Sequence, residues 1–201
     1  MCARDVLSLL AFAGMDSSIP SFSDHLIRLF ASCGSLIECD YAFSRHPRPT
    51  ILSWNSIIYA HVRLGSGQRA LHLYWEMQER GLQPDIVTLL AAVKACGALE
   101  ELDRGRMVHY QIISSGLECD SKLANTLVDM YAKCGSLMEA YRMFIKICRP
   151  NVVSWTIIIA SFSQCNEDCD AAFALHLHDG MLQSGIQPNK ATFMATLKAC
   201  I

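Results

Sequence analysis

An internal repeat constrains the fold of this chain more than any other feature of its 201 residues. The tetrapeptide Cys-Gly-Ser-Leu occupies positions 33–36 and again positions 134–137, a displacement of 101 residues. The same displacement carries the Ser-Trp pair at 53–54 onto the pair at 154–155. Self-similarity at a fixed distance indicates a repeat protein, in which one unit cannot bury its apolar face alone and stacks on its neighbours.

Three shorter units make up this displacement. Each unit ends at a polar residue that precedes the next helical segment, and these end residues are Thr50, Asp85, Asp120, Asn151 and Asn189. The units are therefore 20–50, 51–85, 86–120, 121–151 and 152–189, with lengths of 31, 35, 35, 31 and 38 residues. The first three lengths add up to 101, and the last unit is a 35-residue unit with three extra residues.

The spacing of apolar residues inside each unit predicts two helices. Apolar side chains recur every three or four residues over 54–64 and again over 70–77, as on one face of a helix. A glycine-containing segment separates the two runs, and Gly81 followed by Pro84 indicates where the second helix ends. In the 31-residue units the deficit of about one turn falls within the second helix. We predict an all-α solenoid of helix-turn-helix pairs, with the first helix of each pair lining a concave surface.

The charge balance excludes a strong global attraction to polyanions. The chain has 17 Lys+Arg and 19 Asp+Glu, so a nucleic acid or an anionic lipid has to be met by local groups. The longest uncharged stretch, 150–166, is shorter than a bilayer span and contains several polar residues, so we expect no membrane helix. The first residues, MCARDVLSLLAFAG, match neither a secretory signal nor a transit peptide.

The sequence contains no motif for catalysis. It has no glycine-rich phosphate loop, no nucleophile elbow and no clustered pair of carboxylates. Cys165, Cys169, His176 and His178 follow a spacing that matches no common zinc site. We therefore expect a protein that is not an enzyme and that uses no cofactor, no metal and no small-molecule substrate.

The segment 51–85, ILSWNSIIYAHVRLGSGQRALHLYWEMQERGLQPD, resembles the pentatricopeptide repeat. The stretches SWNSII, LLAAVKACGALEELDRGRMVH, LVDMYAKCGSLMEAYRMF and GIQPN are similar to the PLS subclass of land plants, in its order and spacing. The tetratricopeptide repeat, the alternative helix-pair repeat, has a steady 34-residue period and a tryptophan signature in its first helix, and neither is present.

The resemblance covers 20–201 and implies a right-handed α-solenoid. It assigns the units as S-type, P-type or L-type repeats: 20–50 and 121–151 are S-type, 51–85 and 152–189 are P-type, and 86–120 is L-type. Residues 1–19 form a partial N-terminal repeat, and 190–201 begin a truncated L-type repeat. We infer from these partial repeats that the chain is a fragment of a longer protein.

The resemblance also implies recognition of single-stranded RNA, one base per repeat, through the fifth and the last residue of each unit. In 51–85 these residues are Asn55 and Asp85, a combination that implies U. The Asn amide offers a donor and an acceptor side by side, which suits the edge of uracil, and the carboxylate can hold that amide through water.

Two further units carry polar combinations. Asn125 with Asn151 implies C or U, and Thr156 with Asn189 implies A. Read from the N-terminus with RNA running 5′ to 3′, the four units 51–189 imply U, any base, C or U, then A.

The remaining two units depart from the usual combinations. The pair of Leu90 with Asp120 departs because Leu90 has no hydrogen-bonding edge, and the pair of Asp24 with Thr50 departs as well. We expect these two units to position the RNA without specifying a base.

Other residues are implied to contribute affinity. The second residues Leu52, Val87 and Val153 are implied to wedge between bases, although Lys122 interrupts this series. Arg63 and Lys133, each thirteenth in its unit, are implied to contact phosphate, with an ordinary solvated charge as the equal alternative.

Each last residue also has a structural alternative, because Asp85, Asn151 and Asn189 precede a helix and are suited to cap it. Capping does not explain Asn55 and Asn125, which lie inside a predicted helix where Asn is a poor helix former.

The resemblance implies a sequence-specific binder of single-stranded RNA in the mitochondrion or chloroplast. Such a chain would be the recognition part of an RNA processing or C-to-U editing factor. Organellar editing cofactor proteins are implied to dock on 35-residue units such as 86–120. The alternative function is a helical-repeat scaffold that binds proteins and never contacts RNA. Equal affinity for a UNYA-containing RNA and a scrambled RNA would favour the scaffold.

Overall fold

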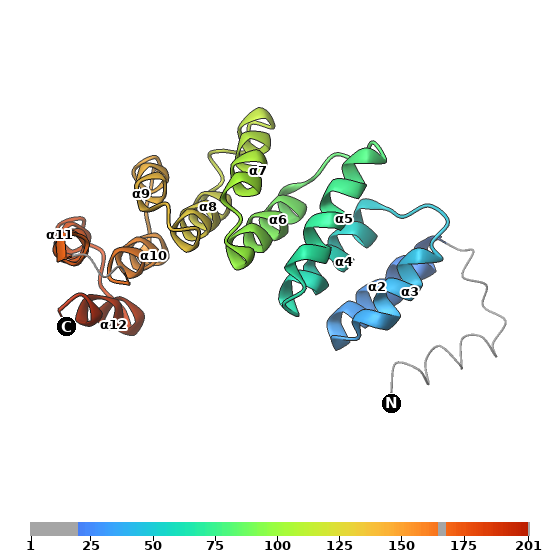
Figure 1. Ribbon diagram of the computed structural model, residues 1–201, viewed down its shortest axis with the longest axis horizontal. Coiled ribbons are helices and arrows are strands. Elements are labelled where there is room, and N and C mark those ends of the chain that lie inside the picture. The colour runs from blue at the N-terminus through green and yellow to red at the C-terminus, as the bar shows by residue number, and fades with distance from the viewer. Residues whose placement is uncertain (1–19, 165–167, 201) are drawn as a thin grey trace. The chain divides into compact units, whose positions relative to one another are not determined.

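The computed structural model describes residues 20–164 and 168–200, and every regular element in them is an α-helix (Figure 1). The partial repeat expected over 1–19 lies outside the described residues, as do Cys165 and two of its neighbours in the 38-residue unit. The helices are α2 (Pro20–Cys33), α3 (Leu36–Ser44), α4 (Ile51–Arg63), α5 (Gly67–Glu79), α6 (Ile86–Leu99), α7 (Leu102–Ser114), α8 (Ser121–Lys133), α9 (Leu137–Ile145), α10 (Val152–Phe162), α11 (Asp168–Gln183) and α12 (Lys190–Lys198).

The chain divides into two compact parts between Ala95 and Cys96, within α6. In the first part, α2 packs against both α3 and α4, and α4 packs against α5. In the second part, α8 pairs with α9 and α10 pairs with α11, while α10 contacts α8 and α12. Within each part, first helices of successive units therefore lie next to each other.

The repeated tetrapeptide Cys-Gly-Ser-Leu, at 33–36 and 134–137, forms the turn between the two helices of a pair. Gly34 and Gly135 have φ values of 76° and 73°, in the left-handed region that glycine tolerates. The N–H of Ser136 donates to the carbonyl of Tyr131 over 2.8 Å, and Ser35 makes the corresponding bond over 3.0 Å. These contacts end the first helix in a Schellman motif, and the following serine starts the second helix.

The second helices differ in length between the two kinds of unit. Helices α3 and α9, in the 31-residue units, have nine residues, whereas α5 and α7, in the 35-residue units, have thirteen. The difference is about one helical turn. The shorter units therefore keep a first helix of full length and lose one turn from the second.

The core repeats with the same 101-residue displacement. Phe43 meets Trp54 edge to face with ring centroids 4.6 Å apart, and Phe144 meets Trp155 in the same way at 4.7 Å. Each pair joins the second helix of a 31-residue unit to the first helix of the next unit. Edge-to-face pairs contribute about 0.5–1.5 kcal/mol beyond the apolar area that they bury, so this contact ties consecutive units together.

The described residues hold no helix that is both long enough and apolar enough to cross a bilayer. Within the same residues, no three His, Cys, Asp or Glu side chains gather as a metal site would require.

Candidate nucleic-acid interface

The last residue of each unit caps the first helix of the next unit. Side-chain oxygens accept hydrogen bonds from the backbone N–H groups of the first turn at four of these caps, which are Thr50, Asp120, Asn151 and Asn189. Asp85 does the same for α6, accepting from the N–H of Thr88 over 2.9 Å. The capping role expected as an alternative is confirmed, and it places these side chains at helix N-termini, where N–H groups are otherwise unpaired.

The expected pair of the unit 51–85 is in direct contact. Asn55, inside α4, donates from Nδ2 to Oδ2 of Asp85 over 2.8 Å, without the bridging water that the sequence suggested. The hydroxyl of Thr88 lies beside both residues, within hydrogen-bond distance of Oδ1 of Asn55 and 2.9 Å from Oδ1 of Asp85. Three side chains from two units thus form one hydrogen-bonded cluster.

The Asp85 carboxylate is stabilised in its charged form. Partial burial raises the pKa of this carboxyl, but hydrogen bonds from Thr88 and Asn55 outweigh that effect and lower the pKa below its ordinary value. Asp85 is therefore an acceptor at neutral pH, and Nδ2 of Asn55, which donates, has to face it. The carboxylate consequently fixes which way the Asn55 amide points.

The amide of Asn55 retains one free donor and one free acceptor. An amide carries two N–H groups and two lone pairs on its oxygen, and the cluster uses one of each. One N–H and one lone pair of the Asn55 amide therefore remain available to the oxygen and N–H on the edge of uracil.

In the unit 152–189, the expected pair is linked through the hydroxyl of a third residue, Thr192. The Oγ1 atoms of Thr156 and Thr192 are 2.7 Å apart, and Thr192 lies 3.0 Å from Oδ1 of Asn189. Thr156 also donates to the carbonyl of Val152 over 2.7 Å. Among the hydrogen bonds of the described residues, none uses Nδ2 of Asn189, so the exposed amide group of this residue presents donors.

The unit 121–151 lacks such a link. Asn151 caps α10 and accepts from Ser154, but no hydrogen bond joins it to Asn125 within the described part of the chain. Oδ1 of Asn125 is buried and has no hydrogen-bond partner among the described residues. Asn125 lies in α8, as expected, but among the described residues no hydrogen bond from Asn151 fixes its side chain.

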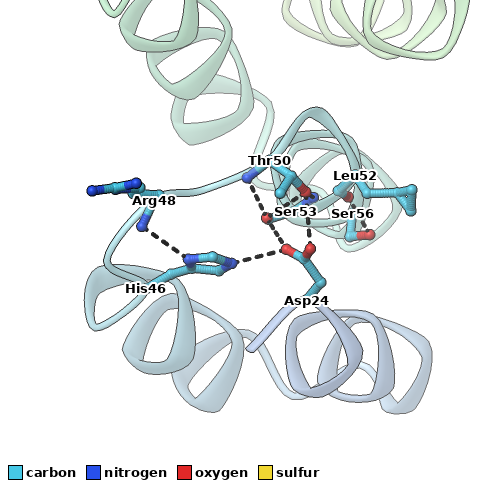
Figure 2. Close-up of polar contacts among 7 residues, drawn as sticks. All are labelled: Asp24, His46, Arg48, Thr50, Leu52, Ser53 and Ser56. Carbon is cyan, nitrogen blue, oxygen red and sulfur yellow. Dashed lines mark hydrogen bonds and ion pairs between the residues drawn. The ribbon is translucent and has the colours of Figure 1, made fainter. Parts of the chain in front are cut away.

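In the unit 20–50, the carboxylate of Asp24 accepts hydrogen bonds from three protein donors (Figure 2). Asp24 accepts from the hydroxyl of Thr50 over 3.0 Å, from Nε2 of His46 over 2.9 Å and from the hydroxyl of Ser53. The N–H of Arg48 donates to Nδ1 of His46, so the ring carries its hydrogen on Nε2 and donates from there. Burial raises the pKa of Asp24, and the hydrogen bonds from Ser53, His46 and Thr50 more than compensate and lower it.

The unit 86–120, whose pair of Leu90 and Asp120 departs from the usual combinations, has one of these residues in each part of the chain. Leu90 lies in α6 and is half-buried. Asp120 caps α8 through the N–H groups of Lys122 and Leu123, both at 2.9 Å. Each residue has a structural role that needs no base.

The three expected wedge residues are exposed apolar side chains. Leu52, Val87 and Val153 are 47%, 49% and 50% exposed, each in the first turn of a first helix. Lys122, at the equivalent position of α8, is also exposed. An apolar side chain that is half exposed beside a polar cluster is available to pack against a base.

The two expected phosphate contacts have protein partners. Arg63 donates to the carbonyls of Ala31 and Ser32, over 2.9 and 3.1 Å, and so caps the C-terminal turn of α2. Lys133 pairs with Asp129, four residues earlier on α8, over 2.7 Å. An exposed ion pair such as Lys133–Asp129 contributes little stability.

Two cations that the sequence did not single out lie beside Asn151. A pocket of about 550 Å³ between α7, the start of α8 and the loop after α9 is lined by Asn151, Lys146 and Arg149, among others. Both cations are exposed. The sequence did not indicate these two cations, because they follow the end of α9, where no helical periodicity relates them to the other units.

Hydroxyl residues at the third position of four units were not predicted from the sequence. Ser53, Thr88, Ser154 and Thr192 each accept a hydrogen bond from the N–H of the preceding cap residue. A signal was present, since a Ser or Thr follows the cap residue by three positions at four starts.

The fold defines the class of protein, a repeat protein built from stacked helix pairs. The family model described as the PPR repeat family matches residues 49–97, and the one described as the PPR repeat matches residues 123–152. The chain belongs to the pentatricopeptide repeat (PPR) family.

Similar curated proteins come from Arabidopsis thaliana. One pentatricopeptide repeat-containing protein is 35% identical over 175 residues, which cover 87% of this chain and 25% of that protein. The pentatricopeptide repeat-containing protein DOT4, named chloroplastic, is 36% identical over 169 residues, or 84% of this chain and 19% of that protein. The chain thus spans about a quarter or less of the length of these relatives.

Solved structures share the fold. The pentatricopeptide repeat protein PPR10, in complex with an 18-nucleotide psaJ RNA element, matches with a TM-score of 0.82 at 22% identity, covering 98% of this chain and 30% of that chain. PPR10 from maize matches with a TM-score of 0.70 at 21% identity, over 88% of this chain and 26% of that chain.

Proposed function

We propose that the chain binds single-stranded RNA in a sequence-specific manner, with one base facing each unit. The observation that carries the proposal is the cluster of Asn55, Asp85 and Thr88, which fixes an amide with one donor and one acceptor free. The exposed apolar side chains of Leu52 and Val87 lie on the units that contribute this cluster. The solved complex of PPR10 with RNA supports the proposal, since this chain shares its fold.

The proposed target carries U, any base, C or U, then A, facing the units from 51–85 to 152–189. The fixed amide of Asn55 supports U at the first position. Among the described residues no hydrogen bond fixes the orientation of the Asn125 amide, which supports acceptance of both pyrimidines. The free amide donors of Asn189 suit a ring nitrogen of adenine. We expect the unit 20–50 to accept any base, because Asp24 has three protein donors.

We further propose that the chain is part of an organellar RNA processing or C-to-U editing factor of the PLS subclass, in the mitochondrion or chloroplast. The alternation of second helices with nine and thirteen residues supports the subclass. Relatives named chloroplastic support the location.

We propose 86–120 as the docking unit for an editing cofactor protein. Helix α7 exposes three large apolar side chains, Met107, Tyr110 and Ile113, which are 57%, 74% and 47% exposed. Helix α5, by contrast, carries no large exposed apolar side chain. Apolar residues exposed together mark a protein contact more often than a solvated face. Replacement of Tyr110 by Glu should abolish cofactor binding and leave RNA binding intact; retained cofactor binding would refute this assignment.

The experiment that tests RNA binding is a fluorescence anisotropy titration. The wild-type chain is titrated against a labelled RNA containing UNYA and against a scrambled RNA of the same composition. We expect the UNYA RNA to bind at least about tenfold more tightly, the difference that about 1.4 kcal/mol produces. Asn55→Asp removes the free amide donor and should abolish this difference.

The protein scaffold predicts another outcome. Equal affinity for the two RNAs, unchanged by Asn55→Asp, would favour a chain that binds proteins alone. Salt offers a second readout, because the dependence of affinity on salt scales with the number of phosphates neutralised. With few cations near the proposed bases, the slope should be shallow.

A further inference from the structure

We propose that the base preference of the unit 51–85 is set in part by Thr88, a residue of the following unit, which positions the Asn55–Asp85 pair through hydrogen bonds to both side chains. The inference rests on the proposed RNA binding and extends it to a residue outside the fifth and last positions. Thr88 is a positioning residue, since it contacts the two base-facing side chains and is itself shielded from any ligand.

Burial separates Thr88 from the base. Its side chain is completely buried, whereas Asn55 and Asp85 are half-buried and reach the surface. The N–H of Thr88 donates to Oδ1 of Asp85 over 2.9 Å, and the N–H of Asp85 points at Oγ1 of Thr88 over 3.3 Å. Thr88 therefore fixes the backbone and the side chain of Asp85 together.

The hydroxyl hydrogen of Thr88 is the link to Asn55. A hydroxyl has one hydrogen, and Oδ1 of Asn55 is nearer to it than Oδ1 of Asp85. When that hydrogen goes to Asn55, the amide is held at its oxygen by Thr88 and at its nitrogen by Asp85. Two anchors on opposite ends of a planar group fix its rotation, and such preorganisation is what discriminates a donor–acceptor edge from its reverse.

The same link recurs at two other junctions. Ser53 donates to Asp24, and Thr192 lies 2.7 Å from the hydroxyl of Thr156 (Figure 2 shows the Ser53 junction). In each case the third residue of one unit bonds to the fifth residue of the preceding unit. The hydrogen bond between the third residue of one unit and the fifth residue of the preceding unit therefore occurs at three junctions.

One junction of the chain provides an internal contrast. Ser154 bonds only to its own cap, Asn151, and the described residues give it no bond to Asn125. Here the hydroxyl supports the helix start alone. The chain thus contains a linked and an unlinked version of the same junction.

The test compares U and C at the base that faces the unit 51–85, in otherwise identical RNAs, using the whole 201-residue chain. We expect wild type to prefer U by about tenfold, as for one well-made base contact. Thr88→Val, which keeps the shape and removes the hydroxyl, should reduce this ratio at least threefold, mainly by weakening U binding. Thr88→Ser, which restores a hydroxyl, should return the ratio to that of wild type.

Ser154→Ala is the matched control. It removes a cap hydroxyl of the same kind, and it should leave the ratio at the 51–85 base and the ratio at its own pyrimidine position as they are in wild type. Circular dichroism of all variants verifies the helical content, so that a folding defect is recognised by equal weakening on every RNA.

The outcomes separate the two proposals. If wild type binds all RNAs alike, RNA recognition fails and the role of Thr88 falls with it. If Asn55→Asp abolishes the preference but Thr88→Val retains it, RNA recognition stands and the positioning role is overturned. A ratio that Thr88→Ser does not restore also overturns it, because the hydroxyl would then not be the active group.

Discussion

Replacing Asp24 by Ala should destabilise the first two units, because it removes the one acceptor shared by three donors. Of these donors, His46 is completely buried at its side chain and Ser53 is also buried, so neither regains water when the carboxylate is lost. The hydroxyl of Thr50 is exposed and can be rehydrated. The cost therefore comes from two buried donors.

The magnitude follows from that count. A buried donor left without a partner costs about 1–3 kcal/mol, so the two together should reduce the free energy of unfolding by about 2–6 kcal/mol. Asp24→Asn keeps one oxygen for His46 and Ser53 and gains an N–H that Thr50 can accept. Its cost should therefore be about 1 kcal/mol, that of ordinary hydrogen-bond rearrangement.

Urea unfolding followed by circular dichroism measures the difference between these variants. Repeat proteins lose stability unit by unit, so amide hydrogen exchange in α2 and α4 should report the same order locally. A loss below about 0.5 kcal/mol for Asp24→Ala, the range of ordinary surface substitutions, would refute the reasoning. Equal losses for the Ala and Asn variants would show that the shared acceptor is not what matters.

Three further predictions concern the same junctions. The pKa of Asp85 is lowered on folding, so its carboxylate stabilises the chain above the unfolded-state pKa of about 3.9. This stabilisation disappears as the pH falls through the folded-state pKa. The urea midpoint should therefore fall more steeply between pH 5 and pH 3 for wild type than for Asp85→Asn. Asn151→Asp provides a carboxylate opposite Asn125 and should shift the preference of that unit from both pyrimidines towards U, measured by titration with paired RNAs; an unchanged ratio would contradict the anchoring argument. Gly81 has a φ of 79° and open space where a Cβ would project, so Gly81→Ala should destabilise by about 1–2 kcal/mol from backbone strain alone, and an unchanged melting temperature would speak against it.

Much of the fold was predictable because it depends on local signals. The two helices per unit follow from apolar spacing, and Gly34 and Gly135 mark turns that require a positive φ. The placement of Asn55 and Asn125 inside first helices was predictable for the same reason. Local sequence determines these features because the partners lie within a few residues.

The contacts between units were not predictable at the same level. His46 reaches Asp24 across 22 residues, and Arg63 reaches Ala31 across 32. Whether a long side chain extends to RNA or folds back onto a helix end depends on the distance between two units, which periodicity does not fix. The link from Thr88 to Asn55 escaped for this reason, although the hydroxyl itself was visible three positions after a cap.

The double use of the last residue limits how such a chain can change its target. Because the side chain that we propose to face the base also starts the next helix, replacement by an apolar residue or a long cation removes a cap worth about 1 kcal/mol in addition to altering recognition. Only short side chains with an acceptor oxygen satisfy both demands. Exchange of Asn for Asp preserves the helix start while changing a donor into an acceptor, so drift between targets is cheapest along that route, and redesign of the repeat should begin there.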